Sequence, residues 1–166
     1  MGKYKLDEID QQILDILINN TRVPFTDIAK KLIISAGTVH VRVKKMEDAG
    51  IIKGSSLVLD YNKLGYAFIA FVGVYLKNTS KINSVIDQLY LIPFITVVDI
   101  TSGDFNIFCK IRAKNTNHFK DIINTIQNIE GVYRTYIMVS LDEKINDKKR
   151  LMGTIFNKVL SKKNGY

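Results

Sequence analysis

Apolar residues recur every three or four positions through the first third of the chain, which is the period of an amphipathic α-helix. The pattern predicts helices over Asp7–Asn19, over Asp27–Leu32 and between Ser35 and Gly50. Early acids suit the positive end of the first helix, Thr26 and Ser35 supply N-caps for the second and third, and Gly50 ends the third. The residues expected to face the core are Ile9, Ile13, Leu14, Leu17, Ile18, Ile28, Ala29, Leu32, Val39, Val43 and Met46.

A tight connection, Ile33–Ile34, joins the second and third helices. Two helices joined in this way, with another before them, describe a helix-turn-helix. The next stretch, Ile51–Asp60, has strand character and a turn at Gly54–Ser56, so it fits either a small wing or an exit strand. We therefore predict a winged helix-turn-helix DNA-binding domain over residues 1–60 and a linker over residues 61–66, where Asn and Gly interrupt the pattern.

The period changes to two beyond residue 66, which is typical of β-strands. Ser102-Gly103-Asp104 has the composition of a hairpin turn, and Ser80 supplies an N-cap. The order is βαββαβ, that of a ferredoxin-like domain over residues 67–145, and the fold class is therefore α+β. The expected elements are strands at Ala67–Leu76, Ile95–Thr101, Phe105–Ala113 and Val132–Leu141, with helices at Ser80–Leu91 and Asn117–Asn128.

Helices cover only one face of such a sheet, so its other face must meet water, a ligand or a second sheet. Four residues expected on that face make it apolar: Phe71, Phe108, Tyr136 and Met138. An apolar sheet face of this kind favours a partner, and we predict a homodimer formed through this domain.

The last segment, residues 146–166, is predicted to be a basic amphipathic extension. Its apolar residues fall on one side of a helix: Leu151, Met152, Ile155, Phe156, Val159 and Leu160. Two interpretations remain open, packing on a neighbouring subunit, which we favour, and lying on a membrane surface.

Composition narrows the class of protein. The chain has 166 residues, 46% of them hydrophobic and 24% charged, which is typical of a globular protein. No apolar run reaches the length of a membrane span and the first residues form no apolar signal segment, so we expect a cytoplasmic protein with no membrane partner. Cys109 is the single cysteine and alternates with apolar neighbours, so it is expected to pack in a strand, and no zinc-ligand spacing is present.

The net charge of +8 is unevenly placed. Residues 1–60 carry 9 basic and 8 acidic side chains, yet 6–15 holds four acids and no base, whereas 22–53 holds seven bases and three acids. A nearly neutral domain with one basic side indicates directed binding to a polyanion. Double-stranded DNA is the partner that a helix-turn-helix with this polarity predicts.

The third helix carries most of the expected DNA contacts. We predict contacts from Ser35, Thr38, His40, Arg42, Lys44, Lys45 and Lys53. Among these, Lys44 and Lys53 are expected on phosphates, and Arg42 on a guanine edge or a phosphate. Two alternatives stay open, an ordinary solvated basic face and an ion pair from Arg42 to Glu47 or Asp48. His40 has no second ligand at helical spacing, so it is expected to be a polar group beside the groove.

Other classes of function are less well supported. The sequence has no Ser/His/acid set, no paired carboxylates in helical register and no glycine-rich phosphate loop, so we expect no enzyme and no cofactor. The main rival is an RNA-binding module, because βαββαβ is also the RNA recognition motif topology. Phe105 and Phe108 fit that motif, but its basic-Gly-aromatic opening is missing and the helical half would be unexplained.

Three motifs in order resemble one known family. Leu6-Asp7-x-x-Asp10-x-x-Ile13-Leu14 is similar to its opening helix, and Ser35-x-x-x-Val39-x-x-Arg42-Val43-x-x-Met46-Glu47-x-x-Gly50-x-Ile52 resembles its recognition helix. Thr101-Ser102-Gly103-Asp104-Phe105 resembles the turn of its effector domain. On these motifs, spread over residues 6–145, the chain resembles the Lrp/AsnC (feast/famine) transcription regulators of bacteria and archaea.

The resemblance implies a transcription regulator that dimerises through its C-terminal domain. Dimers of this family often assemble further, commonly to octamers, and respond to an amino acid or related metabolite bound between dimers. Matching positions place that effector at Thr101, Gly103, Asp104, Asn106, Tyr136 and Met138. Asn106 departs from the pattern, because amino-acid-responsive members often have Asp there and an ammonium group prefers a carboxylate. Two alternatives stay open, a regulator without an effector and a Gly103-Asp104 pair that serves only the turn, with glycine at positive φ.

Overall fold

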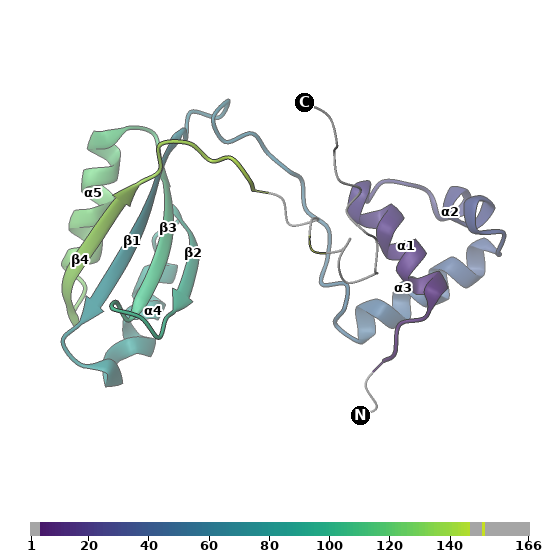
Figure 1. The fold of residues 1–166 in the computed structure, drawn as a ribbon, viewed down its shortest axis with the longest axis horizontal. Coiled ribbons are helices and arrows are strands. Elements are labelled where there is room, and N and C mark those ends of the chain that lie inside the picture. The colour runs from purple at the N-terminus through teal and green to yellow at the C-terminus, as the bar shows by residue number, and fades with distance from the viewer. Residues whose placement is uncertain (1–3, 147–150, 152–166) are drawn as a thin grey trace, which may run out of the picture. The chain divides into compact units, whose positions relative to one another are not determined.

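The computed structural model describes residues 4–146 and Leu151, so the predicted C-terminal extension lies almost entirely outside the described residues. The chain forms two compact units (Figure 1). The first contains the described residues up to Leu57 and those after Lys144, and the second spans Val58–Lys144.

The first unit consists of three helices, α1 (Glu8–Asn19), α2 (Phe25–Leu32) and α3 (Ala36–Asp48). Their apolar faces meet in one small core, as the periodicity predicts. The buried core residues are Ile13, Ile28, Ala29, Val39, Val43 and Met46. The helix-turn-helix prediction is therefore confirmed.

Local polar groups fix the ends of two of these helices. Asp7 caps α1 in a reciprocal capping box with Asp10, and the Ser35 side chain accepts from the Thr38 amide at 3.0 Å at the start of α3. The prediction for α2 is wrong at its start: the helix begins at Phe25 after Pro24, and Thr26 lies inside its first turn. The Pro24 carbonyl accepts from the amides three and four residues on, so the backbone enters the helix without a side-chain cap.

The predicted wing or exit strand does not form in this chain. All residues from 51 to 60 are described, and none is in a strand. A strand requires a partner for its backbone groups, and no other segment of the described chain pairs with this stretch. The segment predicted as a linker, 61–66, is part of the second unit: Tyr66 stacks on Phe94, and the guanidinium of Arg112 lies 5.1 Å from the Tyr61 ring centre.

The second unit is a four-stranded antiparallel sheet with helices on one face (Figure 1). Its strands are β1 (Phe68–Leu76), β2 (Ile95–Ile100), β3 (Ile107–Ala113) and β4 (Val132–Val139), arranged in the order β2-β3-β1-β4. The helices are α4 (Ile82–Tyr90), preceded by the 3₁₀ turn η1 (Thr79–Lys81), and α5 (Thr116–Gln127). This is the predicted βαββαβ domain, and the α+β fold class is confirmed.

Alternate residues of the central strands face the helices and form the larger core. They include Ala70, Val72, Val74, Ile107, Cys109 and Ile111, packed against apolar residues of α4 and α5. Burial raises the pKa of the Cys109 thiol to about 12, which keeps the thiol protonated and unreactive at neutral pH. One predicted cap is wrong: α4 begins at Ile82, because the Asn78 side chain caps the Ser80 amide at 3.0 Å and starts η1 instead.

Among the residues that the structure describes, no helix is both long enough and apolar enough to cross a membrane.

Candidate nucleic-acid interface and ligand-binding loop

The α3 helix buries one side and exposes the other. Val39, Val43 and Met46 are 0–7% exposed, whereas Gly37, Val41 and Lys45 are exposed on the side that faces away from the core. The same sequence pattern that seats the helix on the core therefore determines which side chains are free to contact a partner.

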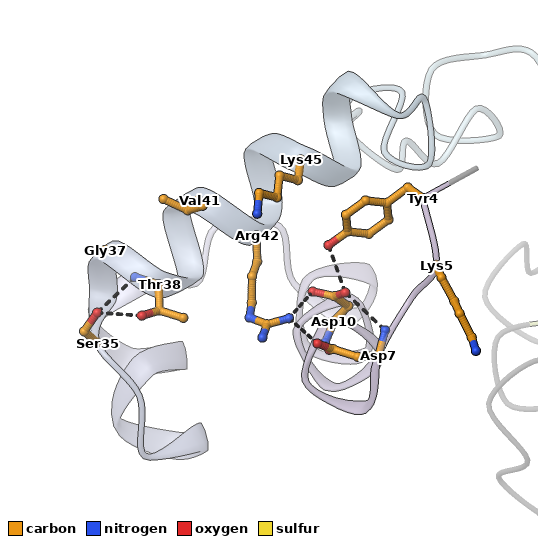
Figure 2. Close-up of a pocket in the computed structure, with 10 residues that line it drawn as sticks. All are labelled: Tyr4, Lys5, Asp7, Asp10, Ser35, Gly37, Thr38, Val41, Arg42 and Lys45. Atoms are coloured by element: carbon orange, nitrogen blue, oxygen red, sulfur yellow. Dashed lines mark hydrogen bonds and ion pairs between the residues drawn. The ribbon is translucent and has the colours of Figure 1, made fainter. Parts of the chain in front are cut away.

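An open hollow of about 610 Å³ lies along α3 and the segment that enters α1 (Figure 2). It brings together four of the seven predicted DNA contacts, Ser35, Thr38, Arg42 and Lys45, with the remaining lining from Tyr4, Lys5, Asp7, Asp10, Gly37 and Val41. Tyr4 and Lys5 were not expected there, because nothing in the local pattern indicates that the first residues fold back along the third helix.

The other three predicted contacts are not part of this hollow. His40 lies toward α2, with its ring centre 6.0 Å from that of Phe25. Lys44 is exposed but pairs with Asp48 at 2.9 Å, and hydrogen bonding to that carboxylate raises the pKa of its ammonium group. Lys53 is exposed beyond the end of α3.

Arg42 forms an ion pair, but not with the partners considered from sequence. Its Nη1 donates to Asp7 Oδ2 at 2.6 Å and to Asp10 Oδ1 at 2.8 Å, 35 and 32 residues away (Figure 2). The alternative of Glu47 or Asp48 is wrong in its partners, because the Arg42 side chain leaves α3 toward α1. This arrangement ties the start of α1 to the middle of α3.

Asp10 is the centre of that cluster, with 1% of its side chain exposed. Its second oxygen, Oδ2, accepts from the Tyr4 hydroxyl at 2.9 Å and from the Asp7 amide at 3.2 Å. A buried carboxylate persists only where such donors replace water. Asp10 therefore joins the N-terminal segment, α1 and α3, a role that its place in the first turn of a helix does not indicate.

The cluster also shifts the acidity of its members. Hydrogen bonds from the Asp10 amide and then from Arg42 lower the pKa of Asp7, and hydrogen bonds to Asp10 and Asp7 raise the pKa of Arg42. Burial and the hydrogen bond to Asp10 raise the pKa of the Tyr4 phenol. At neutral pH Asp7 and Arg42 are charged and Tyr4 is a neutral donor.

In the second unit, a six-residue loop from Thr101 to Asn106 joins β2 to β3, wider than the three-residue turn predicted. The Thr101 amide donates to the Asn106 carbonyl at 3.1 Å, and the Thr101 hydroxyl donates to the Phe105 carbonyl. Asn106 Oδ1 accepts from the Leu76 amide at 2.9 Å. Two of the predicted effector contacts thus also shape the loop.

The tip of this loop is exposed and carries Gly103 and Asp104. The expectation that the turn needs glycine at positive φ is wrong, because Gly103 does not have a left-handed backbone. A wide loop spreads the reversal over several residues, and a side chain at position 103 would meet only open space. The fold of this chain therefore gives no reason for glycine there.

The remaining predicted effector contacts, Tyr136 and Met138, lie on β4 opposite Gly73 and Phe71 of β1, on the sheet face without helices. Phe105 bends from the loop over this face and covers Gly73, where a Cβ atom would lie 2.5 Å from its ring. Gly73 and Phe105 thus link the loop to the open face. The only sequence signal was a glycine in the middle of a strand pattern, which indicates close approach of another group.

Aromatic rings and a charged cluster share this open face. Phe71 and Phe108 stack with centres 5.6 Å apart, and Phe105 stacks on Phe108 at 5.8 Å. Glu143, which follows β4, pairs with both Lys110 and Arg112 of β3. The predicted apolar residues therefore share one surface, and the adjacent cations already have a carboxylate partner.

No group of three or more His, Cys, Asp or Glu side chains arranged to hold a metal ion occurs in the described part of the chain.

Two family models match consecutive parts of the chain. A winged helix-turn-helix DNA-binding domain matches residues 6–53, and an Lrp/AsnC ligand binding domain matches residues 69–149. Together they account for both units of the structure, including the helical half that an RNA recognition motif would leave unexplained.

Known proteins and solved structures that resemble this chain are regulators of the same kind. The regulatory protein AsnC of Haemophilus influenzae is 34% identical over 143 residues, 86% of this chain and 95% of that protein. The structure of AsnC from E. coli superposes with a TM-score of 0.83 at 32% identity, over 87% of this chain and 97% of that one. A transcriptional regulator from Neisseria meningitidis, solved with L-methionine, superposes with a TM-score of 0.81 at 20% identity, over 87% and 95% of the two chains. The chain therefore belongs to the Lrp/AsnC family of DNA-binding transcriptional regulators.

Proposed function

We propose that this regulator binds duplex DNA in a sequence-specific manner by placing the exposed side of α3 in the major groove. The observation that carries this proposal is the α3 surface itself, where Ser35, Thr38 and Lys45 surround a hollow while the opposite side is anchored in the core. Lysine ammonium groups neutralise phosphates and short hydroxyl side chains reach base edges. We place this activity in the cytoplasm, where bacterial and archaeal chromosomes lie.

Each predicted contact has its own role in this proposal. Lys45 and Lys53 approach phosphates. Lys44 also binds a phosphate, in exchange for its ion pair with Asp48. His40 contacts the edge of the groove from the α2 side. Arg42 uses Nη1 for its two carboxylates and presents its other nitrogens to DNA, so it positions the helix as well as contacting the duplex.

A gel-shift comparison tests the duplex proposal. Sheared chromosomal DNA of the source organism, labelled and competed with unlabelled fragments, should yield discrete retained fragments, whereas single-stranded RNA of matching sequence should compete weakly. Lys45→Ala should lower duplex affinity, and Lys120→Ala, an exposed lysine on α5, serves as the matched control. Preferential binding of the RNA would contradict the proposal.

We further propose that two copies pair through the open face of the sheet. A surface built on the exposed Tyr136 and the half-buried Phe71, Phe108 and Met138 is costly to leave in water. Pairing would also supply the two α3 helices that a helix-turn-helix regulator needs to read two half-sites. Sedimentation equilibrium should give at least a dimer mass, up to that of an octamer, and Phe108→Asp should shift the protein toward the monomer.

We also propose that an amino acid or related metabolite binds at the Thr101–Asn106 loop, between sheet domains of neighbouring copies. Gly103 and Asp104 are exposed at the tip of the loop, and the fold does not require glycine there. Asp104 can bind an ammonium group, and backbone amides at Gly103 can bind a carboxylate. The L-methionine in the Neisseria meningitidis regulator is a ligand of this chemical class.

Thermal denaturation with each common amino acid tests the effector proposal. One or a few should raise the melting temperature of the wild type, and Asp104→Ala should lose the effect. Asp87→Ala, an exposed carboxylate on α4, is the matched control and should keep it. The absence of any shift across the set would favour a regulator without an effector.

A further inference from the structure

The centre of the exposed side of α3 carries no charge. Gly37 and Val41 lie one turn apart on it, with Thr38 and Lys45 on one flank and Lys44 on the other. Val41 is 51% exposed, whereas Val39 and Val43 of the same helix are 0% and 7% exposed. In Figure 2 the Val41 side chain projects away from the Arg42–Asp7–Asp10 cluster.

Gly37 has no structural explanation within this unit. A Cβ atom there would meet only Ser35 Oγ at 3.7 Å, an ordinary contact, and its backbone is not left-handed. Glycine is the least favourable residue in a helix apart from proline. The fold does not need glycine at this exposed position. Because glycine has no side chain, a binding partner can come closer to the backbone of α3 there.

The absence of charge at Gly37 and Val41 indicates which part of the DNA approaches them. The major groove has phosphates along its walls and base edges on its floor, so the middle of an inserted helix meets bases and its flanks meet phosphates. The only apolar group on that floor is the 5-methyl of thymine. An exposed valine at the middle of the helix, with cations only at the flanks, matches this distribution.

We propose that Val41 selects thymine by packing its methyl groups against the thymine 5-methyl, and that Gly37 permits the close approach this requires. The inference rests on the proposed insertion of α3 in the major groove. It adds a specificity-determining pair that forms no hydrogen bond and carries no charge.

The test removes one thymine methyl group at a time from the DNA. Duplexes are first selected from a random pool with the full-length wild-type protein, and each conserved thymine in the selected site is then replaced by deoxyuridine, which lacks only the 5-methyl. Burying one methyl group is worth about a 4-fold change in affinity, so at least one replacement per half-site should weaken wild-type binding by about that factor. Val41→Ala keeps only its Cβ methyl for this contact, so its thymine-to-uracil affinity ratio should be smaller than that of the wild type.

Two further variants separate this contact from general effects. Lys45→Ala should weaken binding of both duplexes while keeping the thymine-to-uracil ratio of the wild type. Gly37→Ala should keep or raise the melting temperature yet weaken binding to the selected duplex by more than to a random one. A Gly37→Ala protein that binds the selected duplex normally would overturn the role of Gly37.

The outcomes distinguish this inference from the proposed function. If selection enriches no sequence, the proposed sequence-specific binding fails and the inference fails with it. If sites are enriched but no deoxyuridine replacement weakens wild-type binding, or Val41→Ala keeps the full wild-type ratio, the thymine contact is overturned while DNA binding stands.

Discussion

Replacing Asp10 with asparagine tests whether a buried carboxylate holds α3 to α1. The carboxylate uses both oxygens as acceptors, one for Arg42 and the other for the Tyr4 hydroxyl and the Asp7 amide. Asparagine keeps the shape of the side chain but has one acceptor oxygen and one amide NH2 group, which is a donor. In either orientation this NH2 must face a donor, Arg42 on one side or the Asp7 amide on the other. The substitution therefore breaks the cluster without leaving a cavity.

The expected cost follows from burial and from the bonds lost. A hydrogen bond to a charged group contributes about 1.5–3 kcal/mol, and breaking a fully buried ion pair costs about 3–5 kcal/mol. Arg42 keeps Asp7 as a partner and its side chain is 24% exposed, so the lower range applies. We expect Asp10→Asn to lower the free energy of unfolding of the helical unit by about 2 kcal/mol.

Urea denaturation followed by circular dichroism at 222 nm gives the measurement, because the helical unit contributes most of the signal that should shift. The matched control is Asp27→Asn, which removes an exposed pair with Lys30 at 3.5 Å. Such surface pairs contribute about 0–1 kcal/mol. The transition of the sheet unit should be unchanged in both variants and serves as an internal reference.

Two results would refute this reasoning. Equal effects of Asp10→Asn and Asp27→Asn would mean that the buried cluster adds nothing to stability. A loss of DNA affinity in Arg42→Ala of about 1–3 kcal/mol, with stability unchanged, would mean that Arg42 contacts bases and does not position the helix.

Three further predictions follow from individual contacts. The pKa of Asp7 lies below its ordinary value of 3.8 in the folded protein. Its ionised form therefore stabilises the fold above that value, and the stabilisation is lost as pH falls through the lower folded pKa. In an acid titration, Asp7→Asn should lose less stability below about pH 4 than the wild type. Gly73→Ala should displace the Phe105 ring at a cost of about 1 kcal/mol and weaken dimerisation in sedimentation, whereas an unchanged dimer would show that Phe105 has no part in pairing. Asn106→Asp keeps an acceptor for the Leu76 amide and adds a negative charge, so amino-acid thermal shifts should grow, and smaller shifts would place the ammonium group elsewhere.

The periodicity of the sequence predicts most of the fold because each element buries one continuous apolar face. Val39, Val43 and Met46 mark the buried side of α3, and the βαββαβ order follows from the change in period after residue 66. The stretch 51–60 has strand composition without forming a strand, because composition indicates a preference for extended backbone and says nothing about whether a partner strand is present.

The candidate site is predicted less well, because its geometry depends on contacts between distant residues. Asp10 has the sequence context of a helix-dipole acid, and its burial depends on Arg42, 32 residues later. His40 and Lys45 are both among the predicted DNA contacts, although five residues of a helix separate them by about 140° around the axis, and this spacing indicates from sequence alone that they face different sides.

The geometry of the loop in the second unit also depends on contacts that local sequence does not predict. Gly103 in a Ser-Gly-Asp segment indicates a tight turn, but the hydrogen bond between Thr101 and Asn106 closes a wider loop in which no left-handed glycine is needed. Local composition identified the position of the loop, and only the structure showed that Phe105 turns back over Gly73.

The salt dependence of duplex affinity in Lys45→Ala tests the central claim most directly. If α3 inserts in the major groove with Lys45 against a phosphate, the slope of log affinity against log salt should fall by about one unit for each copy of the helix bound, while Lys120→Ala leaves it unchanged. Equal slopes for the wild type and Lys45→Ala, with unchanged affinity, would contradict the assignment of α3 as the DNA-reading helix.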